Sequence, residues 1–392
     1  MDPVRNPFVP GAGSPPPALA GRADILERAR LTLARVAQGR SAKSLMLVGL
    51  RGVGKTVLLN RVHEMAEAEG YQAVMIETPE TKRLASLLVP PLRSLLFRLD
   101  RMENISEQVK RAMRVLKSFA GAVSIKYGEV EIGLDIDPER GSADSGDIEA
   151  DLSELFVAVA EAAKSRGTAV ALIIDELQYL TEDELSAVIM ALHRVSQKQL
   201  PLVLIGAGLP QLVGLAGRSK SYAERLFDYP VVGALTRLDA IKALAEPVER
   251  EGASFDDDAL ADIIAKTEGY PYFLQEWGYH AWNIAVGSPI TAEVVSNATR
   301  EAIANLDQSF FRVRLDRLTP REKAYLRAMS ELGPGPHRSG DIAEKMGAAV
   351  ASVAPLRGGL IKKGMIYSPT HGDTAFTVPL FDQFMRRTMP AD

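Results

Sequence analysis

The sequence predicts an α/β fold, with a parallel sheet covered by helices on both faces, followed by a helical domain and a winged-helix domain. Between residues 20 and 232, apolar runs alternate with helical patterns, which is typical of a parallel sheet. The runs lie at 45–48, 73–76, 169–174, 202–205 and 228–231. Residues 235–305 show helical patterns only. From residue 318 a helix, a two-helix unit and two short strands follow, in the order of a winged helix.

The first 18 residues predict a flexible leader. They contain Pro15, Pro16, Pro17 and repeated glycines, without apolar periodicity. They also lack the apolar core of a signal peptide, so we expect a soluble, cytoplasmic protein. The chain of 392 residues has no cysteine. This excludes disulfides, thiol catalysis and cysteine-ligated metals, and it fits a reducing compartment.

The segment after the first apolar run has the pattern of a phosphate-binding loop, G-x-x-x-x-G-K-T. Its glycines let backbone N–H groups face an anion, and the helix that follows adds about half a positive charge at its N-terminus. We therefore expect it to bind ATP, with Lys55 on the β- and γ-phosphates and the Thr56 hydroxyl on Mg²⁺. The residues of this loop are Gly49, Leu50, Arg51, Gly52, Val53, Gly54, Lys55 and Thr56.

Two carboxylates end the third apolar run. Asp175 and Glu176 follow residues 169–174 and would lie at the carboxyl edge of the sheet, beside the phosphate loop. Asp175 is expected to hold Mg²⁺ through water, and Glu176 to orient and deprotonate the attacking water. A strand that merely ends at a helix cap is the structural alternative.

Phosphoryl transfer also needs positive charge on the γ-phosphate in the transition state. Arg218 and Arg225 follow the fourth strand, and we favour Arg225 because it precedes Leu226 and Phe227 on a short helix that leads into the fifth strand. Whether this arginine acts in its own subunit or in a neighbouring one stays open. A surface salt bridge is the alternative role.

Two further segments complete the domain plan. Residues 121–137 alternate with period two around Tyr127 and Gly128, which predicts an inserted β-hairpin. Near residue 319, Thr319 is a helix cap and Pro320 the first helical residue. We divide the chain into the leader (1–18), an ATPase core with the hairpin (19–234), a small helical domain (235–306) and a winged-helix domain (307–392).

Taken together, the phosphate loop (Walker A), Asp175-Glu176 (Walker B) and residues 223–227 resemble an AAA+ or STAND-type P-loop ATPase. The branch they resemble contains the archaeal and eukaryotic origin-recognition initiators. The resemblance implies that the helical domain is a lid and that two segments lie near the adenine and ribose. These segments contribute Ala20, Gly21, Arg22, Tyr270 and Pro271.

Two departures from this family favour a slow nucleotide switch over fast turnover. The fourth strand ends in Gly206-Ala207-Gly208, without the Asn, Thr or Ser that usually senses the γ-phosphate. Pro271 stands where many relatives have a sensing arginine.

The winged helix leaves two functions open. Residues 312–392 carry 13 Lys and Arg against 8 Asp and Glu, whereas the chain as a whole has a net charge of −4. This asymmetry favours duplex DNA as the partner of residues 307–392. The basic residues proposed for this contact are Arg338, Arg357, Lys362 and Lys363 near the two-helix unit, and Arg386 and Arg387 near the end of the chain. The alternative is a signalling or assembly ATPase, with a homo-oligomer or protein partner on the winged helix. A metabolic kinase is the third and weakest class.

Overall fold

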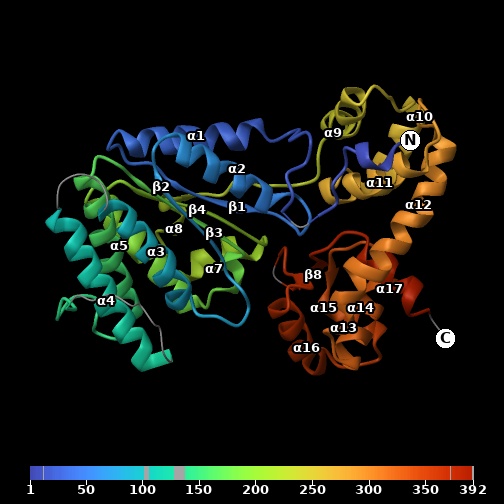
Figure 1. Cartoon of the computed structure of the whole chain (residues 1–392). Coiled ribbons are helices and arrows are strands. Elements are labelled where there is room, and N and C mark those ends of the chain that lie inside the picture. The colour runs from blue at the N-terminus through green and yellow to red at the C-terminus, as the bar shows by residue number, and fades with distance from the viewer. Residues whose placement is uncertain (12, 101–105, 128–136, 371, 391–392) are drawn as a thin grey trace.

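The computed structural model describes residues 1–11, 13–100, 106–127, 137–370 and 372–390, and side chains at 123–127 are not described. It places an α/β body beside two helical parts (Figure 1). No helix among the described residues combines the length and the hydropathy needed to cross a membrane.

The body is built on a five-stranded, fully parallel sheet, as predicted. Its strand order is β2-β3-β4-β1-β5. The strands are β1 (Ser44–Val48), β2 (Gln72–Glu77), β3 (Val170–Asp175), β4 (Leu202–Gly208) and β5 (Phe227–Asp228). Val48 pairs with Gly208, and Glu77 with Asp175, so these strands end at one edge. The phosphate loop leaves β1 at this edge.

Helices cover both faces of the sheet, because alternate strand residues enter two separate cores. Leu45 and Leu47 pack into the core beneath the first helix pair, whereas Met46 and Val48 face the opposite core. The first face carries α1 (Ala23–Ala37) and α2 (Lys55–Ala68). The second face carries α3 (Leu84–Asp100), α4 (Glu107–Tyr127), α5 (Ile148–Ser165), α6 (Glu182–Gln197), α7 (Gln211–Ser219) and α8 (Ala223–Leu226). Burial on both faces explains the continuous apolar runs of β1, β3 and β4.

The hairpin predicted at 121–137 is wrong in its first half. Residues 121–127 form the end of α4. The helix is already established by Val109, Leu116 and Phe119, which recur at helical spacing and are buried against the body. The packing of these helical positions favours continuation of the helix through residues 121–127 over the strand that their short period-two alternation predicted. Residues 128–136, which include the predicted turn, lie outside the described residues.

The lid is helical, as predicted. It contains α9 (Arg237–Arg250), α10 (Asp257–Thr267), α11 (Pro271–Ile284) and α12 (Ala292–Leu306). A π-helical turn (Asp307–Phe311) and α13 (Arg312–Asp316) continue α12 without a break. The predicted boundary between residues 306 and 307 therefore falls inside one helical segment.

The C-terminal part has the winged-helix order, as predicted. Its elements are α14 (Pro320–Glu331), β6 (His337–Arg338), α15 (Ser339–Lys345), α16 (Val350–Lys362), β7 (Ile366–Tyr367), β8 (Asp373–Phe376) and α17 (Phe381–Thr388). Thr319 caps α14 in a capping box with Glu322, and Pro320 is its first residue. One hydrophobic core, which includes Trp277, Phe311 and Phe384, joins the lid to this part.

The leader packs on the lid, contrary to the expected flexible segment. A 3-10 turn (Pro3–Arg5) begins it, and Phe8 is buried in the lid core at 2% exposure. Trp282 Nε1 donates a hydrogen bond to the Asp2 carbonyl at 2.8 Å. Gly278 makes room for the leader, since a Cβ there would lie 2.6 Å from the Phe8 ring. Composition misled the prediction, because a single aromatic anchor has no periodicity.

We expect Phe8→Ala to lower the free energy of unfolding by about 3 kcal/mol, because it leaves a cavity in the lid core. Val4→Ala is the matched control. Val4 is 93% exposed, so its truncation should change stability by less than about 0.5 kcal/mol. Thermal denaturation followed by circular dichroism tests both variants. Equal stability of the two would show that the leader is not anchored through Phe8.

Candidate nucleotide-binding site

The phosphate loop joins β1 to α2 at the carboxyl edge of the sheet. Gly54 caps α2 with φ of 89°, a left-handed conformation that favours glycine. Gly49 has no space for a side chain, because a Cβ would lie 2.1 Å from the Val232 carbonyl oxygen. These backbone demands explain the glycines of the motif without reference to a ligand.

Lys55 is buried at the start of α2. Its Nζ donates to the carbonyl oxygens of Gly49 at 3.0 Å and Leu50 at 2.9 Å. Burial lowers the pKa of Lys55 to about 8, although Glu176 and Asp175 favour its charged form. An ammonium held by neutral carbonyls in a desolvated loop is prepared to bind an anion.

The Thr56 hydroxyl and Asp175 lie together, as predicted. Thr56 Oγ1 donates to Asp175 Oδ2 at 2.6 Å, and burial is the main cause that raises the pKa of Asp175. Mg²⁺ in NTP sites keeps waters and takes one or two protein oxygens beside the phosphates. This pair fits that requirement, and the described residues contain no cluster of three or more His, Asp or Glu that would hold a metal alone.

Glu176 is held in a special backbone conformation. Its φ of 57° is left-handed, which is uncommon for a residue with a side chain and occurs often at functional sites. The Gln178 amide donates to its carboxylate. Arg51 Nη1 lies 3.7 Å from the same carboxylate. Glu176 therefore points into the site, but it is already engaged by two neighbours.

Gln178 is a residue that the sequence prediction missed. Its Oε1 accepts from the backbone N–H of Leu209 at 3.0 Å, directly after β4. Gly206 and Gly208 admit the 3-10 turn (Leu177–Tyr179), because a Cβ on Gly206 would lie 2.2 Å from Leu177. Gln178 thus links the end of β4 to Glu176. It lies at the strand end where the family that the sequence resembles usually has an Asn, Thr or Ser.

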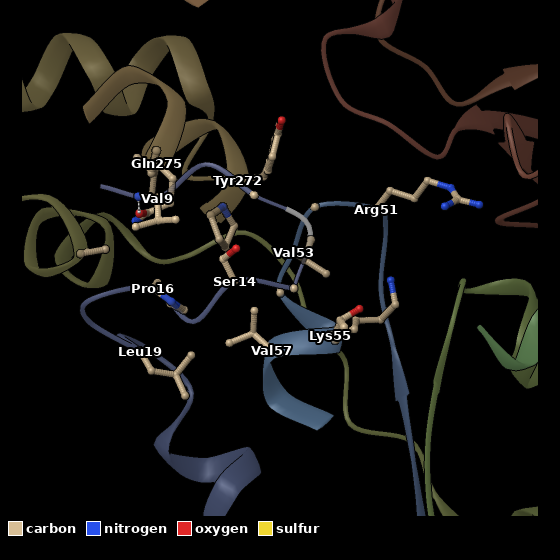
Figure 2. A pocket seen from close by; sticks show the side chains of 18 of the residues that line it. Val9, Ser14, Pro16, Leu19, Arg51, Val53, Lys55, Val57, Tyr272 and Gln275 are labelled. Carbon is tan, nitrogen blue, oxygen red and sulfur yellow. Dashed lines mark hydrogen bonds between the residues drawn. The ribbon is translucent and has the colours of Figure 1, made fainter. Parts of the chain in front are cut away.

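A cavity of about 320 Å³ extends from the phosphate loop between the leader and the lid (Figure 2). Predicted residues lining it are Ala20, Arg22, Arg51, Gly52, Val53, Gly54, Lys55, Thr56, Glu176 and Pro271. Gly49, Leu50, Gly21, Tyr270 and Asp175 do not line it. Lining residues that the sequence did not suggest are Val9, Pro16, Leu19, Leu235, Ala243, Tyr272, Leu274, Gln275, Phe310 and Arg314. Its apolar end fits a nucleobase, and its charged end fits phosphates.

Arg22, which belongs to a segment expected near the adenine, lines the cavity and also has a structural role. It is buried, and its Nη2 donates to the carbonyl oxygens of Val53 at 3.2 Å and Gly233 at 2.5 Å. It therefore ties the phosphate loop to the segment that enters the lid. Burial lowers the pKa of this guanidinium, although Asp24 and Asp239 favour its charge.

The predicted arginine fingers lie outside the cavity. Arg225 on α8 and Arg218 on α7 are both exposed, and neither lines the site. In this arrangement they do not reach the phosphate loop of their own chain. Arg225 in a neighbouring copy stays a prediction.

Comparison with known proteins supports the geometry. Residues 18–205 match the family model described as an AAA ATPase domain, and residues 308–385 match a domain of unknown function, DUF8462. The chain is 23% identical over 353 residues to an uncharacterized HTH-type transcriptional regulator of Methanocaldococcus jannaschii, covering 86% of this chain and 80% of the relative.

Two solved structures resemble the whole chain. A Walker-type ATPase of Pyrococcus abyssi superimposes with a TM-score of 0.56 at 16% identity, covering 94% of this chain and 96% of that one. The Orc1 protein of Aeropyrum pernix, solved in complex with DNA, gives a TM-score of 0.47 at 16% identity, covering 96% and 94%. The fold predicted from the phosphate loop and the alternating strands is confirmed by the first of these. Residues 18–205 thus match an AAA ATPase domain, and the chain as a whole shares its fold with the Walker-type ATPase of Pyrococcus abyssi.

Proposed function

We propose that the protein is an ATP-binding, slowly hydrolysing switch in which the nucleotide controls the winged-helix domain. The observation that carries this proposal is a direct contact between that domain and the phosphate loop. The backbone N–H of Arg51 donates to the Thr377 carbonyl at 3.1 Å, directly after β8. A Cβ on Gly364 would lie 2.8 Å from the Arg51 guanidinium. A change at the loop therefore acts on the winged helix without an intermediate.

Slow turnover is supported by the engagement of Glu176. As a general base, Glu176 would accept a proton from the attacking water. The Gln178 amide donates to one oxygen of this carboxylate and Arg51 Nη1 lies 3.7 Å from the other, so both neighbours compete with the water for the carboxylate. Mg²⁺, held by Thr56 and through water by Asp175, would neutralise charge on the phosphates. Arg225 of a neighbouring copy would supply further positive charge in a homo-oligomer.

DNA is the first partner that we propose for residues 307–392. It is supported by the excess of Lys and Arg in this segment and by the M. jannaschii relative, an uncharacterized HTH-type transcriptional regulator. Arg338 and Lys362 are exposed at the two-helix unit. Phosphate contact with little sequence preference fits such residues better than base readout.

A protein partner is the second candidate, because most of the expected cations are already engaged. Arg357 donates to Thr374 and Ser368, and Lys363 pairs with Glu322 at 2.7 Å. Arg386 and Arg387 pair with Asp382 at 2.8 Å and Asp307 at 2.7 Å. The exposed positions of α16 include Ala351, Ser352, Ala354, Pro355 and Gly358, which are poorly suited to base edges.

Lys55→Ala should abolish detectable ATP binding, whereas Glu176→Gln should bind ATP normally and hydrolyse it at least about 100-fold more slowly. Calorimetry measures binding, and phosphate release measures turnover. Glu182→Gln, an exposed position at the start of α6, is the matched control and should behave as wild type. Unchanged turnover in Glu176→Gln would remove this residue from the mechanism.

ATP binding should weaken at alkaline pH. Below about pH 8 the Lys55 amine is mostly protonated in the free protein. Bound phosphates should raise the pKa of Lys55, because they favour its charged form. Above pH 8, ATP binding should therefore be accompanied by uptake of a proton. Affinity should then fall by up to about tenfold per pH unit. Calorimetry in two buffers of different ionisation enthalpy would detect the proton uptake. Lys55→Arg, which stays charged, should show none. Constant affinity to about pH 9.5 would contradict a depressed Lys55 pKa.

Binding of the full-length protein to duplex DNA across a salt series separates the two partners. If DNA is the partner, affinity should fall steeply with salt and respond to ATP. Arg338→Gln or Lys362→Gln should each reduce the salt slope by about one. Lys242→Gln, an exposed lysine on lid helix α9, is the control. If the protein does not bind DNA with ATP, with ADP or without nucleotide, a protein partner becomes the favoured candidate.

A further inference from the structure

A half-buried arginine reaches the nucleotide cavity from outside the ATPase body. Arg314 lies on α13, the short helix between the lid and the winged-helix domain. It lines the same cavity as Lys55, Thr56 and Glu176. Arg314 belongs neither to the phosphate-loop motif nor to the predicted arginine fingers.

Arg314 has no ion-pair partner among the described carboxylates. Its guanidinium lies over the Phe310 ring at 3.9 Å from the centroid and donates to the Phe310 carbonyl. Phe310 in turn stacks on Tyr272 of α11, with ring centroids 4.7 Å apart. Burial lowers the pKa of Arg314 to about 10, and the neighbouring Arg51 adds to the effect. The side chain is thus positioned by aromatic contacts and left without a compensating charge.

The neighbouring basic residues differ in this respect. A second cavity of roughly 160 Å³ lies beside the first and is lined by Arg51, Arg314, Arg317 and Lys363. Arg317 pairs with Glu80 at 2.9 Å, and Lys363 pairs with Glu322 at 2.7 Å. Arg51 has a longer contact with Glu176 at 3.7 Å. Arg51 and Arg314, which line both cavities, are therefore the pair with the least compensation.

Two guanidinium groups brought together in a largely buried place are costly unless an anion joins them. Planar guanidinium groups bind phosphate oxygens with two parallel hydrogen bonds. The anion that fits is the terminal phosphate of a bound nucleotide, which Arg51 and Arg314 would share with Lys55. ATP carries such a terminal group and ADP does not.

We propose that Arg314, together with Arg51, binds the terminal phosphate of ATP and so distinguishes ATP from ADP. This inference rests on the nucleotide binding proposed above. Loss of the terminal phosphate leaves two like charges facing each other, which favours separation of the winged-helix domain from the loop. The helical segment 292–316 and the shared core would move with Arg314, so the lid and the winged helix respond as one unit.

The test compares two ligands, ADP and the non-hydrolysable analogue AMP-PNP, on the full-length protein by calorimetry. Arg314→Gln should weaken AMP-PNP binding by about ten- to 100-fold and change ADP binding by less than about threefold. Arg314→Lys keeps the charge and should recover part of the loss. Arg317→Gln is the matched control three residues away, and it should change neither affinity.

Hydrogen exchange distinguishes binding of the terminal phosphate from a purely structural role of Arg314, because a structural role would not depend on which nucleotide is bound. In the wild type, AMP-PNP should protect residues 364–370 and 372–377 more than ADP does, and Arg314→Gln should remove the difference. Equal effects of Arg314→Gln on both nucleotides, or none on either, would overturn the role of Arg314 while leaving nucleotide binding intact. Absence of binding of both nucleotides to the wild-type protein would instead refute the proposed function.

Discussion

The structure depends on positive charge gathered at the phosphate loop and only partly neutralised by the protein. Lys55 is held by carbonyl oxygens, Arg51 by Tyr179 and a long contact with Glu176, and Arg314 by an aromatic ring and a carbonyl. Burial makes the charges of Lys55 and Arg314 costly, as their lowered pKa values indicate. A polyanion would relieve this cost, which is the physical basis of the proposed coupling between nucleotide binding and domain arrangement.

All parts of the chain meet at this loop. The lid reaches it through the Tyr272 N–H, which donates to the Gly52 carbonyl at 3.1 Å, and the winged helix through the Thr377 carbonyl. The leader crosses the start of α2, where Asn60 donates to the Gly13 carbonyl at 3.4 Å. Since the lid and the winged helix share a core, these contacts link one packed unit to the body.

The carboxyl edge of the sheet shows how small residues position the Glu176 carboxylate. Gly206 and Gly208 leave the space in which the turn after Glu176 packs, and Gln178 connects that turn to β4. The left-handed conformation of Glu176 is maintained by these contacts. β4 ends without a polar side chain, and Gln178, three positions after Asp175, provides a polar side chain at this place instead.

Local sequence patterns determined the sheet strands, the phosphate loop with Thr56 and Asp175, the lid helices and the winged-helix order, because each depends on periodicity, caps or a fixed spacing. Tertiary structure alone decided the anchoring of the leader through Phe8, the continuation of α4 through residues 121–127, and the exclusion of Arg225 from its own cavity. It also decided that Arg314 reaches the same cavity as Lys55, since the two residues are far apart in sequence. Such contacts between distant segments leave no local pattern, whereas a phosphate loop carries its whole backbone geometry within eight residues.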